Sequence, residues 1–65
     1  MNVYMTSLVS TNRITGVAKV ISVLTSCSAQ KHISNRFKQF ELMQKLFDGG
    51  KHTFRIEDKT TIIGL

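Results

Sequence analysis

The sequence predicts an α+β fold of two layers, in which one amphipathic helix packs on a small antiparallel or mixed β-sheet in the order ββαββ. Three observations support this class. Apolar residues recur at helical spacing between residues 29 and 48. β-branched residues are concentrated in residues 17–25, and residues 52–65 alternate as paired strands do. Because the chain has only 65 residues, we expect one small domain over residues 1–65.

The first expected strand covers residues 2–10, which read NVYMTSLVS. Apolar side chains fall on both faces of this alternating segment, so its sequence does not indicate which face is buried. A turn is expected next, because Asn12 tolerates positive φ and Gly16 adopts it freely.

Residues 17–25, VAKVISVLT, allow two interpretations. Their β-branched side chains are stiff at χ1 and favour a buried strand. The spacing of Ile14, Val17, Ile21 and Leu24 also suits one face of a helix. We favour the strand.

The main helix is expected over residues 29–48. An apolar stripe runs along it at steps of four, three, three and four residues: Ile33, Phe37, Phe40, Met43 and Phe47. We expect this stripe to face the sheet, with Phe37 and Phe40 largely buried. Ser26 or Ser28 can cap the N-terminus, and Gly49-Gly50 can end the helix in the left-handed conformation.

The C-terminal residues 52–65 are expected to form a β-hairpin. A two-residue turn at Asp58-Lys59 would place one set of residues on a common apolar face: Phe54, Ile56, Thr61, Ile63 and Leu65. The polar face would carry Arg55, Glu57 and Thr60.

One segment suggests an alternative fold. Residues 28–41, SAQKHISNRFKQFE, resemble the recognition helix of bacterial winged helix-turn-helix regulators. Those helices often carry a Val/Ile-Ser-Arg-like core followed by basic residues and an apolar-Glu pair. Leu46-Phe47 and the basic hairpin after it would be similar to the wing. The resemblance covers about half of the chain and implies a winged helix-turn-helix in which residues 17–24 form the preceding helix.

The sequence lacks a catalytic or metal-binding pattern. Cys27 is the only cysteine, and no third group or oxyanion loop accompanies it and His32, so a structural thiol is expected. Cys27, His32, His52 and Asp48 lack the paired spacing typical of zinc ligands. The four carboxylates occupy positions that we expect to be solvated. We therefore expect a protein that is not an enzyme and that binds no metal or cofactor.

Charge carries more information about partners. Nine Lys and Arg residues against four Asp and Glu residues give a net charge of +5, which favours anionic partners. The predicted helix places Lys31, Asn35, Lys38 and Lys45 opposite the apolar stripe, where they suit either a merely solvated face or a binding face. The candidate residues for binding nucleic acid or an acidic partner are Lys31, Asn35, Arg36, Lys38, Lys45, Lys51 and Arg55. Leu42 and Leu46 are expected on the solvent side, as candidate protein contacts.

These features favour a small basic binding protein, either an accessory or a regulator that binds nucleic acid. The alternative is a protein-interaction module that regulates or inhibits an acidic protein. No run of about 18 apolar residues occurs, so we expect no membrane span. The single cysteine suits a reduced thiol, so we expect a cytoplasmic location. Self-association as a homodimer, or docking of an obligate partner, is also expected, because the sheet edges are open and its second face would carry apolar groups such as Leu8, Val20 and Ile62.

Overall fold

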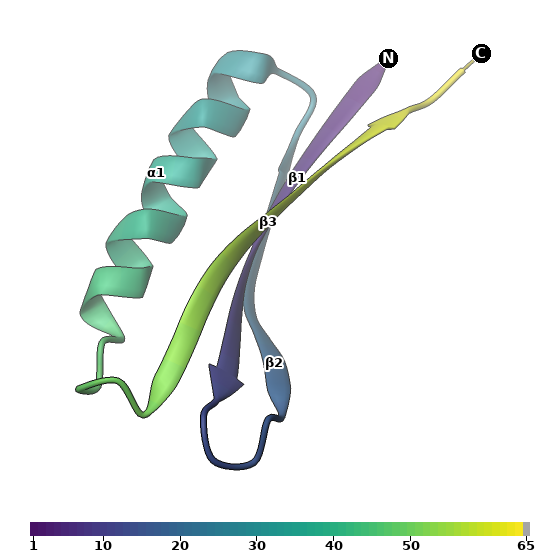
Figure 1. Ribbon diagram of the computed structural model, residues 1–65. Coiled ribbons are helices and arrows are strands. Elements are labelled where there is room, and N and C mark those ends of the chain that lie inside the picture. Colours follow the sequence, from purple (N-terminus) through teal and green to yellow (C-terminus); the bar gives the residue numbers. More distant parts are fainter. Residues whose placement is uncertain (65) are drawn as a thin grey trace.

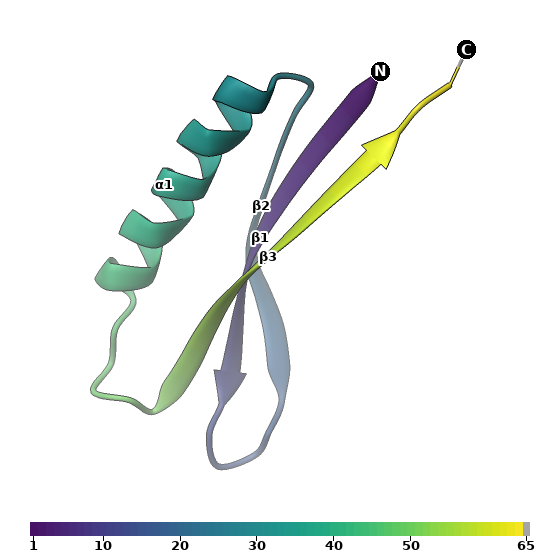
Figure 2. The ribbon, with the colours of Figure 1, turned by 45° about the horizontal axis from the view of Figure 1, so that its top comes forward.

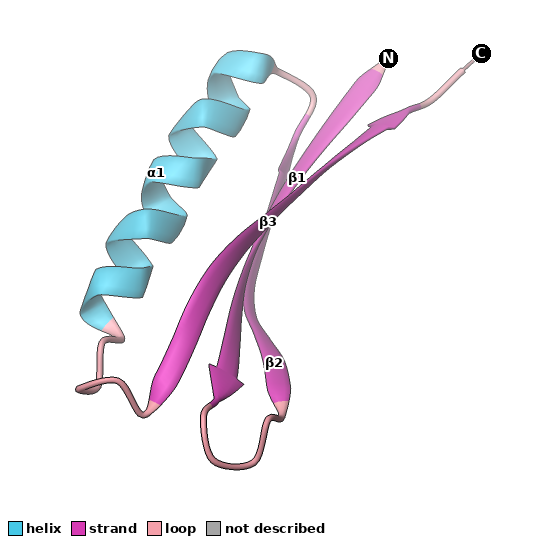
Figure 3. Cartoon of the chain, in the orientation of Figure 1, coloured by secondary structure: helices cyan, strands magenta, loops and turns pink. Residues whose placement is uncertain are grey.

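The computed structural model describes residues 1–64, and Figure 1 shows one helix lying against a three-stranded sheet. The elements follow the order β1 (Asn2–Asn12), β2 (Ala18–Ser26), α1 (Ala29–Lys45) and β3 (His52–Ile62). The helix covers one face of the sheet and leaves the other face open (Figure 3). This arrangement confirms the predicted two-layer α+β class.

The sheet is antiparallel with the strand order β2-β1-β3, so β1 is the central strand. β1 and β3 pair along their whole length, from Asn2 opposite Ile62 to Asn12 opposite His52. The pairing extends to the termini, since Met1 and Ile63 exchange main-chain hydrogen bonds of 2.7 and 2.9 Å. Met1 and Ile63 therefore lie side by side, at the same end of the sheet (Figure 2).

β3 is one continuous strand where the sequence suggested a hairpin. Asp58 pairs with Thr6 and Lys59 with Met5, so the expected turn residues lie inside the ladder. A two-residue hairpin turn needs positive φ, and no residue other than glycine adopts it within residues 1–64. The fold accordingly has one strand fewer than ββαββ. Leu65, the last residue of the expected hairpin, lies outside the described residues.

β2 confirms the strand interpretation of residues 17–25. Its pairing with β1 is shifted once, because Leu8 lies opposite Ser22 whereas Val9 lies opposite Val20. Ile21 is therefore the extra residue of a β-bulge. The winged helix-turn-helix alternative requires a helix over residues 17–24, and that alternative is wrong.

The helix begins and ends close to the predicted positions. Ser28 caps its N-terminus, and the Ser28 hydroxyl accepts a hydrogen bond from the main-chain N–H of Lys31 at 3.4 Å. Beyond the C-terminus, Gly49 and Gly50 have φ angles of 76° and 93°. Glycine adopts these left-handed values without steric cost, so the chain can reverse into β3 there.

The face that α1 turns toward the sheet differs from the prediction. Asn35 and Gln39 are 3% and 1% exposed, whereas Phe37 and Phe40 are 65% and 44% exposed. The expectation that Phe37 and Phe40 are buried in the core is therefore wrong. Helical periodicity shows which side chains share a face of α1. Which of these faces turns toward the sheet depends on the side chains that the sheet carries on its helix side.

The core of the single chain is thin. Leu8 and Val9 are the buried apolar residues of the described chain, and Thr6, Ser7 and Ser10 of the same strand are buried with them. Leu8 was expected on the second sheet face, but it is fully buried on the helix side. The molecule measures 45 × 21 × 10 Å with a radius of gyration of 13.5 Å, whereas a compact domain of this length has about 11 Å. The helix of residues 1–64 lacks the length and apolar content needed to span a bilayer.

Candidate functional site

α1 presents three chemically different rows of side chains. The inward row contacts the sheet and consists of His32, Asn35, Gln39 and Leu42. The Gln39 side-chain amide donates hydrogen bonds to the carbonyl oxygens of Thr6 at 3.0 Å and Ser22 at 3.3 Å. The His32 ring stacks on Tyr4 with ring centroids 5.3 Å apart. These contacts fix the rotation of the helix on the sheet.

The lysine row consists of Lys31, Lys38 and Lys45, all of which are exposed. Successive members are seven residues apart, which is nearly two helical turns, so they lie in line over about 21 Å. Lys19 of β2 extends this basic side, because it lines the same hollow as Leu46, the residue after Lys45.

The apolar stripe runs along the opposite flank of the helix. Each lysine of the row lies two residues before a stripe residue, and residues two apart on a helix point about 200° apart. Three of the stripe residues are largely exposed: Ile33 at 55%, Phe37 at 65% and Phe47 at 70%. The helix therefore separates a cationic surface from an apolar one.

Contacts with the strands show which side each surface occupies. Arg36, next to the stripe, forms an ion pair of 3.0 Å with Asp58 of β3. Met43 and Phe47 of the stripe line a hollow of about 540 Å³ together with Phe54 of β3. The stripe consequently lies on the β3 side of the helix and the lysine row on the β2 side.

Most of the acidic side chains are paired away from the lysine row. Of the four carboxylates, Asp58 pairs with Arg36, Glu57 with Arg55 at 2.7 Å, and Asp48 with His52. Within residues 1–64, no lysine forms an ion pair with a carboxylate. The fourth carboxylate, Glu41, is exposed on α1. The unpaired positive charge of the molecule is therefore carried chiefly by lysines.

In the structure, the basic residues that the sequence indicated as candidates fall into an exposed group and an ion-paired group. Lys31, Lys38 and Lys45 form one exposed row, whereas Arg36 and Arg55 are engaged in ion pairs. Arg55 also donates to the Thr11 hydroxyl at 3.3 Å, on the strand face away from the helix. The structure therefore does not bring Arg55 together with the lysine row.

Two other expectations are corrected by burial. Asn35 belongs to the inward row, so its expected place on the exposed basic face is wrong. Leu42 is half-buried and lies three residues from Gln39, on the sheet side of the helix, so the expectation that it faces solvent is also wrong. Leu46 is 38% exposed and lines the hollow near Lys19.

Sequence reasoning missed Lys19. Its signal was weak, because one lysine in a strand has no partner at helical spacing to mark its face. Lys19 is placed on the helix side of the sheet by the pairing of β2 with β1, in which Lys19 lies opposite Ser10. This pairing cannot be read from the sequence around Lys19.

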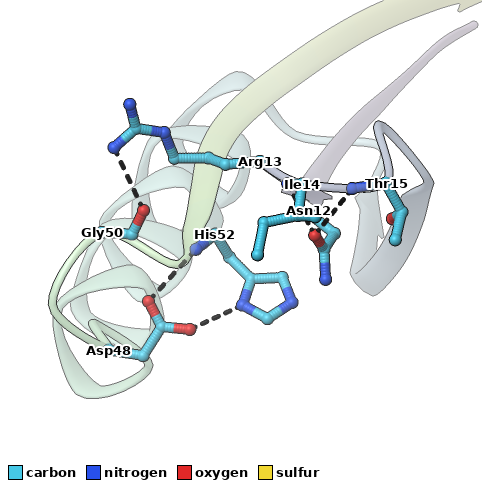
Figure 4. A network of polar contacts seen from close by, with 7 residues as sticks. All are labelled: Asn12, Arg13, Ile14, Thr15, Asp48, Gly50 and His52. Atoms are coloured by element: carbon cyan, nitrogen blue, oxygen red, sulfur yellow. Dashed lines mark hydrogen bonds and ion pairs between the residues drawn. The ribbon is translucent and has the colours of Figure 1, made fainter.

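A polar network joins the β1–β2 turn to the start of β3, around Gly50 and His52 (Figure 4). The Arg13 main-chain N–H donates to the Lys51 carbonyl at 3.1 Å, and its guanidinium donates to the Gly50 carbonyl at 3.3 Å. The Asn12 side chain accepts hydrogen bonds from the main-chain N–H groups of Ile14 and Thr15 at 2.8 and 3.1 Å. These contacts tie the β1–β2 turn to the loop that follows α1.

Asp48 and His52 form the second half of this network. Asp48 Oδ1 accepts the main-chain N–H of His52 at 3.2 Å, and Oδ2 lies 2.5 Å from the His52 ring Nδ1. The hydrogen bond from the His52 ring lowers the pKa of the Asp48 carboxyl below its ordinary value of 3.8. The pair closes one side of the hollow that Lys19 and Leu46 also line. This hollow has a volume of about 540 Å³ and differs from the hollow that Met43 and Phe47 line.

Two further kinds of group bear on chemistry: the side chains that could bind a metal, and the thiol of Cys27. Within the part of the chain that the structure describes, no three His, Cys, Asp or Glu side chains gather as a metal site would require. Cys27 is an exposed free thiol just before the Ser28 cap. The two flanks of α1 offer one cationic and one apolar contact surface.

Comparison with known proteins gives no further assignment: no protein-family model, no curated protein and no solved structure matches this chain significantly. The geometry of the two helix flanks is therefore the basis for any functional conclusion.

Proposed function

We propose that the protein is a non-catalytic binding protein that contacts the phosphates of a nucleic-acid duplex through Lys31, Lys38 and Lys45. The observation that carries this proposal is their alignment on one exposed flank of α1, free of acidic partners within residues 1–64. Lys19 would add a fourth cation at the end of the row.

A duplex suits this surface better than a single strand does. Proteins that bind single strands combine cations with aromatic side chains on which bases stack. Here Phe37, Phe40 and Phe47 lie on the opposite flank from the lysine row, so bases cannot stack on them while the lysines hold the backbone. Lysine is a flexible point charge rather than a fork of fixed donors, so we expect little sequence preference.

Fluorescence anisotropy with a labelled duplex of about 20 base pairs would test the proposal. Phosphate contacts from Lys31, Lys38 and Lys45 predict a slope near −2.7 for log K against log salt concentration, or about a 40-fold loss of affinity between 50 and 200 mM salt. A fourth contact from Lys19 would bring the slope to about −3.6. Replacing Lys38 with Gln should reduce the magnitude of the slope by about 0.9.

Lys59 offers a matched control, because it carries the same charge but belongs to β3 and faces away from the helix. The Lys59→Gln variant should keep the slope of the parent protein. Equal losses from Lys38→Gln and Lys59→Gln would contradict a defined lysine row. No binding near 50 mM salt would overturn the proposal and leave an acidic protein as the partner class.

A further inference from the structure

We infer that α1 pairs antiparallel with α1 of a second copy of this chain, through the apolar stripe. This inference concerns a different surface from the lysine row and stands independently of nucleic-acid binding. The exposed fractions of the residues Phe37, Phe40 and Phe47 are 65%, 44% and 70%. With about 200 Å² for each free ring, they leave roughly 350 Å² of aromatic surface in water.

The spacing of the stripe is symmetric about Phe40. The steps from Ile33 to Phe47 are four, three, three and four residues, so the stripe reads the same in both directions. In an antiparallel pair centred on Phe40, Phe40 meets its own copy. Ile33 then meets Phe47, and Phe37 meets Met43. A two-fold interface requires this kind of self-complementary pattern.

The surface next to the stripe offers a matching recess. The hollow lined by Met43, Phe47 and Phe54 lies at the C-terminal end of the stripe. In the antiparallel pair, Phe37 of the second copy lies opposite Met43 at this hollow. Because the arrangement is symmetric, each copy would insert its Phe37 ring into the hollow of the other copy.

The thin core explains why the occupant should be a second copy. The chain exposes 4816 Å², whereas a compact monomer of 7.3 kDa exposes about 4,200 Å². Small domains with so little core gain stability from disulfides, metals or oligomerisation. This chain has one cysteine, and residues 1–64 contain no metal-ligand cluster. The roughly 350 Å² of aromatic surface would supply almost half of the 800 Å² or so that each partner buries in a stable interface.

The charges of the helix permit this pairing despite the net charge of +5. Arg36, which borders the stripe, is already paired with Asp58 of its own chain. The lysine rows lie on the opposite flanks of the two helices, so they remain exposed and apart from each other. Pairing through the lysine flank would instead bring like charges together.

Sedimentation of the parent chain at about 50 µM tests the inference. We expect a species of twice the 7.3 kDa chain mass, and a species of 7.3 kDa for the Phe37→Glu variant. Ile14→Glu is the matched control, because Ile14 is 93% exposed in the β1–β2 turn, away from the stripe, and this variant should remain dimeric. A monomeric parent, or a Phe37→Glu variant that is still dimeric, would overturn the inference.

A cross-linking measurement keeps the test decisive if Phe37→Glu fails to fold. In a chain with Cys27→Ser, the Phe40→Cys variant should form a disulfide-linked dimer on mild oxidation, because the two copies of position 40 meet at the two-fold axis. Lys38→Cys in the same background should give at least tenfold less cross-linked dimer, since it lies on the opposite flank. Equal cross-linking at positions 38 and 40 would overturn the pairing.

The two surfaces can be separated experimentally. Lys38→Gln should keep the sedimentation of the parent while it changes duplex binding. A parent that is dimeric but does not bind duplex would contradict the proposed function alone, and a monomer that binds duplex would contradict the dimer alone.

Discussion

The side-chain amide of Gln39 donates a buried hydrogen bond to the main-chain carbonyl of Thr6 at 3.0 Å, at the centre of the contact between helix and sheet. The same amide also donates to the carbonyl of Ser22, beside the bulged residue Ile21. A bulge interrupts the regular ladder of hydrogen bonds between strands. One glutamine thus joins the helix to both β1 and β2 where their pairing is irregular.

The first prediction concerns this amide. Replacing Gln39 with Met keeps the length of the side chain but removes both donors, so the buried Thr6 carbonyl loses a partner. We expect the free energy of unfolding to fall by about 1–3 kcal/mol. In a thermal melt the midpoint should drop by about 4–8 °C for each kcal/mol lost. Gln30→Met, at an exposed position of the same helix, should leave the midpoint almost unchanged. Equal midpoints for the two variants would mean that the hydrogen bonds of Gln39, in the inward row, do not contribute to the free energy of unfolding.

Local sequence determines the elements of this fold well. The cap at Ser28, the left-handed Gly49 and Gly50 and the β-branched residues 17–25 act within a few residues of themselves, and the structure confirms each of them. The expected hairpin at Asp58-Lys59 failed for a non-local reason. β1 is long enough to pair with the whole of residues 52–62, so no turn is needed there.

The orientation of the helix could not be predicted in this way. The 4-3-3-4 spacing made the apolar stripe visible, but helical periodicity is the same whether a stripe meets the sheet or a second molecule. Lys31, Lys38 and Lys45 were found because their seven-residue spacing aligns them in either case. The placement of Asn35 depended on contacts with β1 and β2, which no local pattern contains.

The second prediction compares an inward and an outward apolar residue. Leu8 is fully buried, so Leu8→Ala should lower the free energy of unfolding by about 2–5 kcal/mol. Phe37 keeps only about a third of its surface from water in the single chain, so Phe37→Ala should cost about 1–2 kcal/mol when the chain is monomeric. Urea unfolding at submicromolar concentration would measure both. A larger loss for Phe37→Ala at this dilution would show that the stripe faces the sheet.

The third prediction concerns acid stability. Because the hydrogen bond from His52 lowers the pKa of Asp48 in the folded state, this carboxylate stabilises the fold above its ordinary pKa of 3.8. That contribution is lost as the pH falls below 3.8 and through the lower folded pKa. The midpoint of thermal unfolding should therefore fall more steeply for the parent than for Asp48→Asn between pH 5 and 2.5. Glu41→Gln removes a carboxylate outside this network and should follow the parent. Parallel curves for the parent and Asp48→Asn would contradict the coupling.

The fourth prediction uses Glu41 to test whether a nucleic-acid duplex would bind at the lysine row. On the helix surface Glu41 lies three residues after Lys38 and four before Lys45, so its charge opposes phosphates that the lysine row would hold. Glu41→Gln should therefore tighten duplex binding by about two- to fivefold at low salt, and the gain should shrink as salt screens the charges. Thr61→Lys adds the same unit of charge at an exposed position of β3, on the sheet face away from the helix, and serves as the control. Anisotropy titrations of both variants would separate a local effect from one of net charge. If Thr61→Lys tightened binding as much as Glu41→Gln, the duplex would be responding to the total charge of the molecule and not to the row on α1.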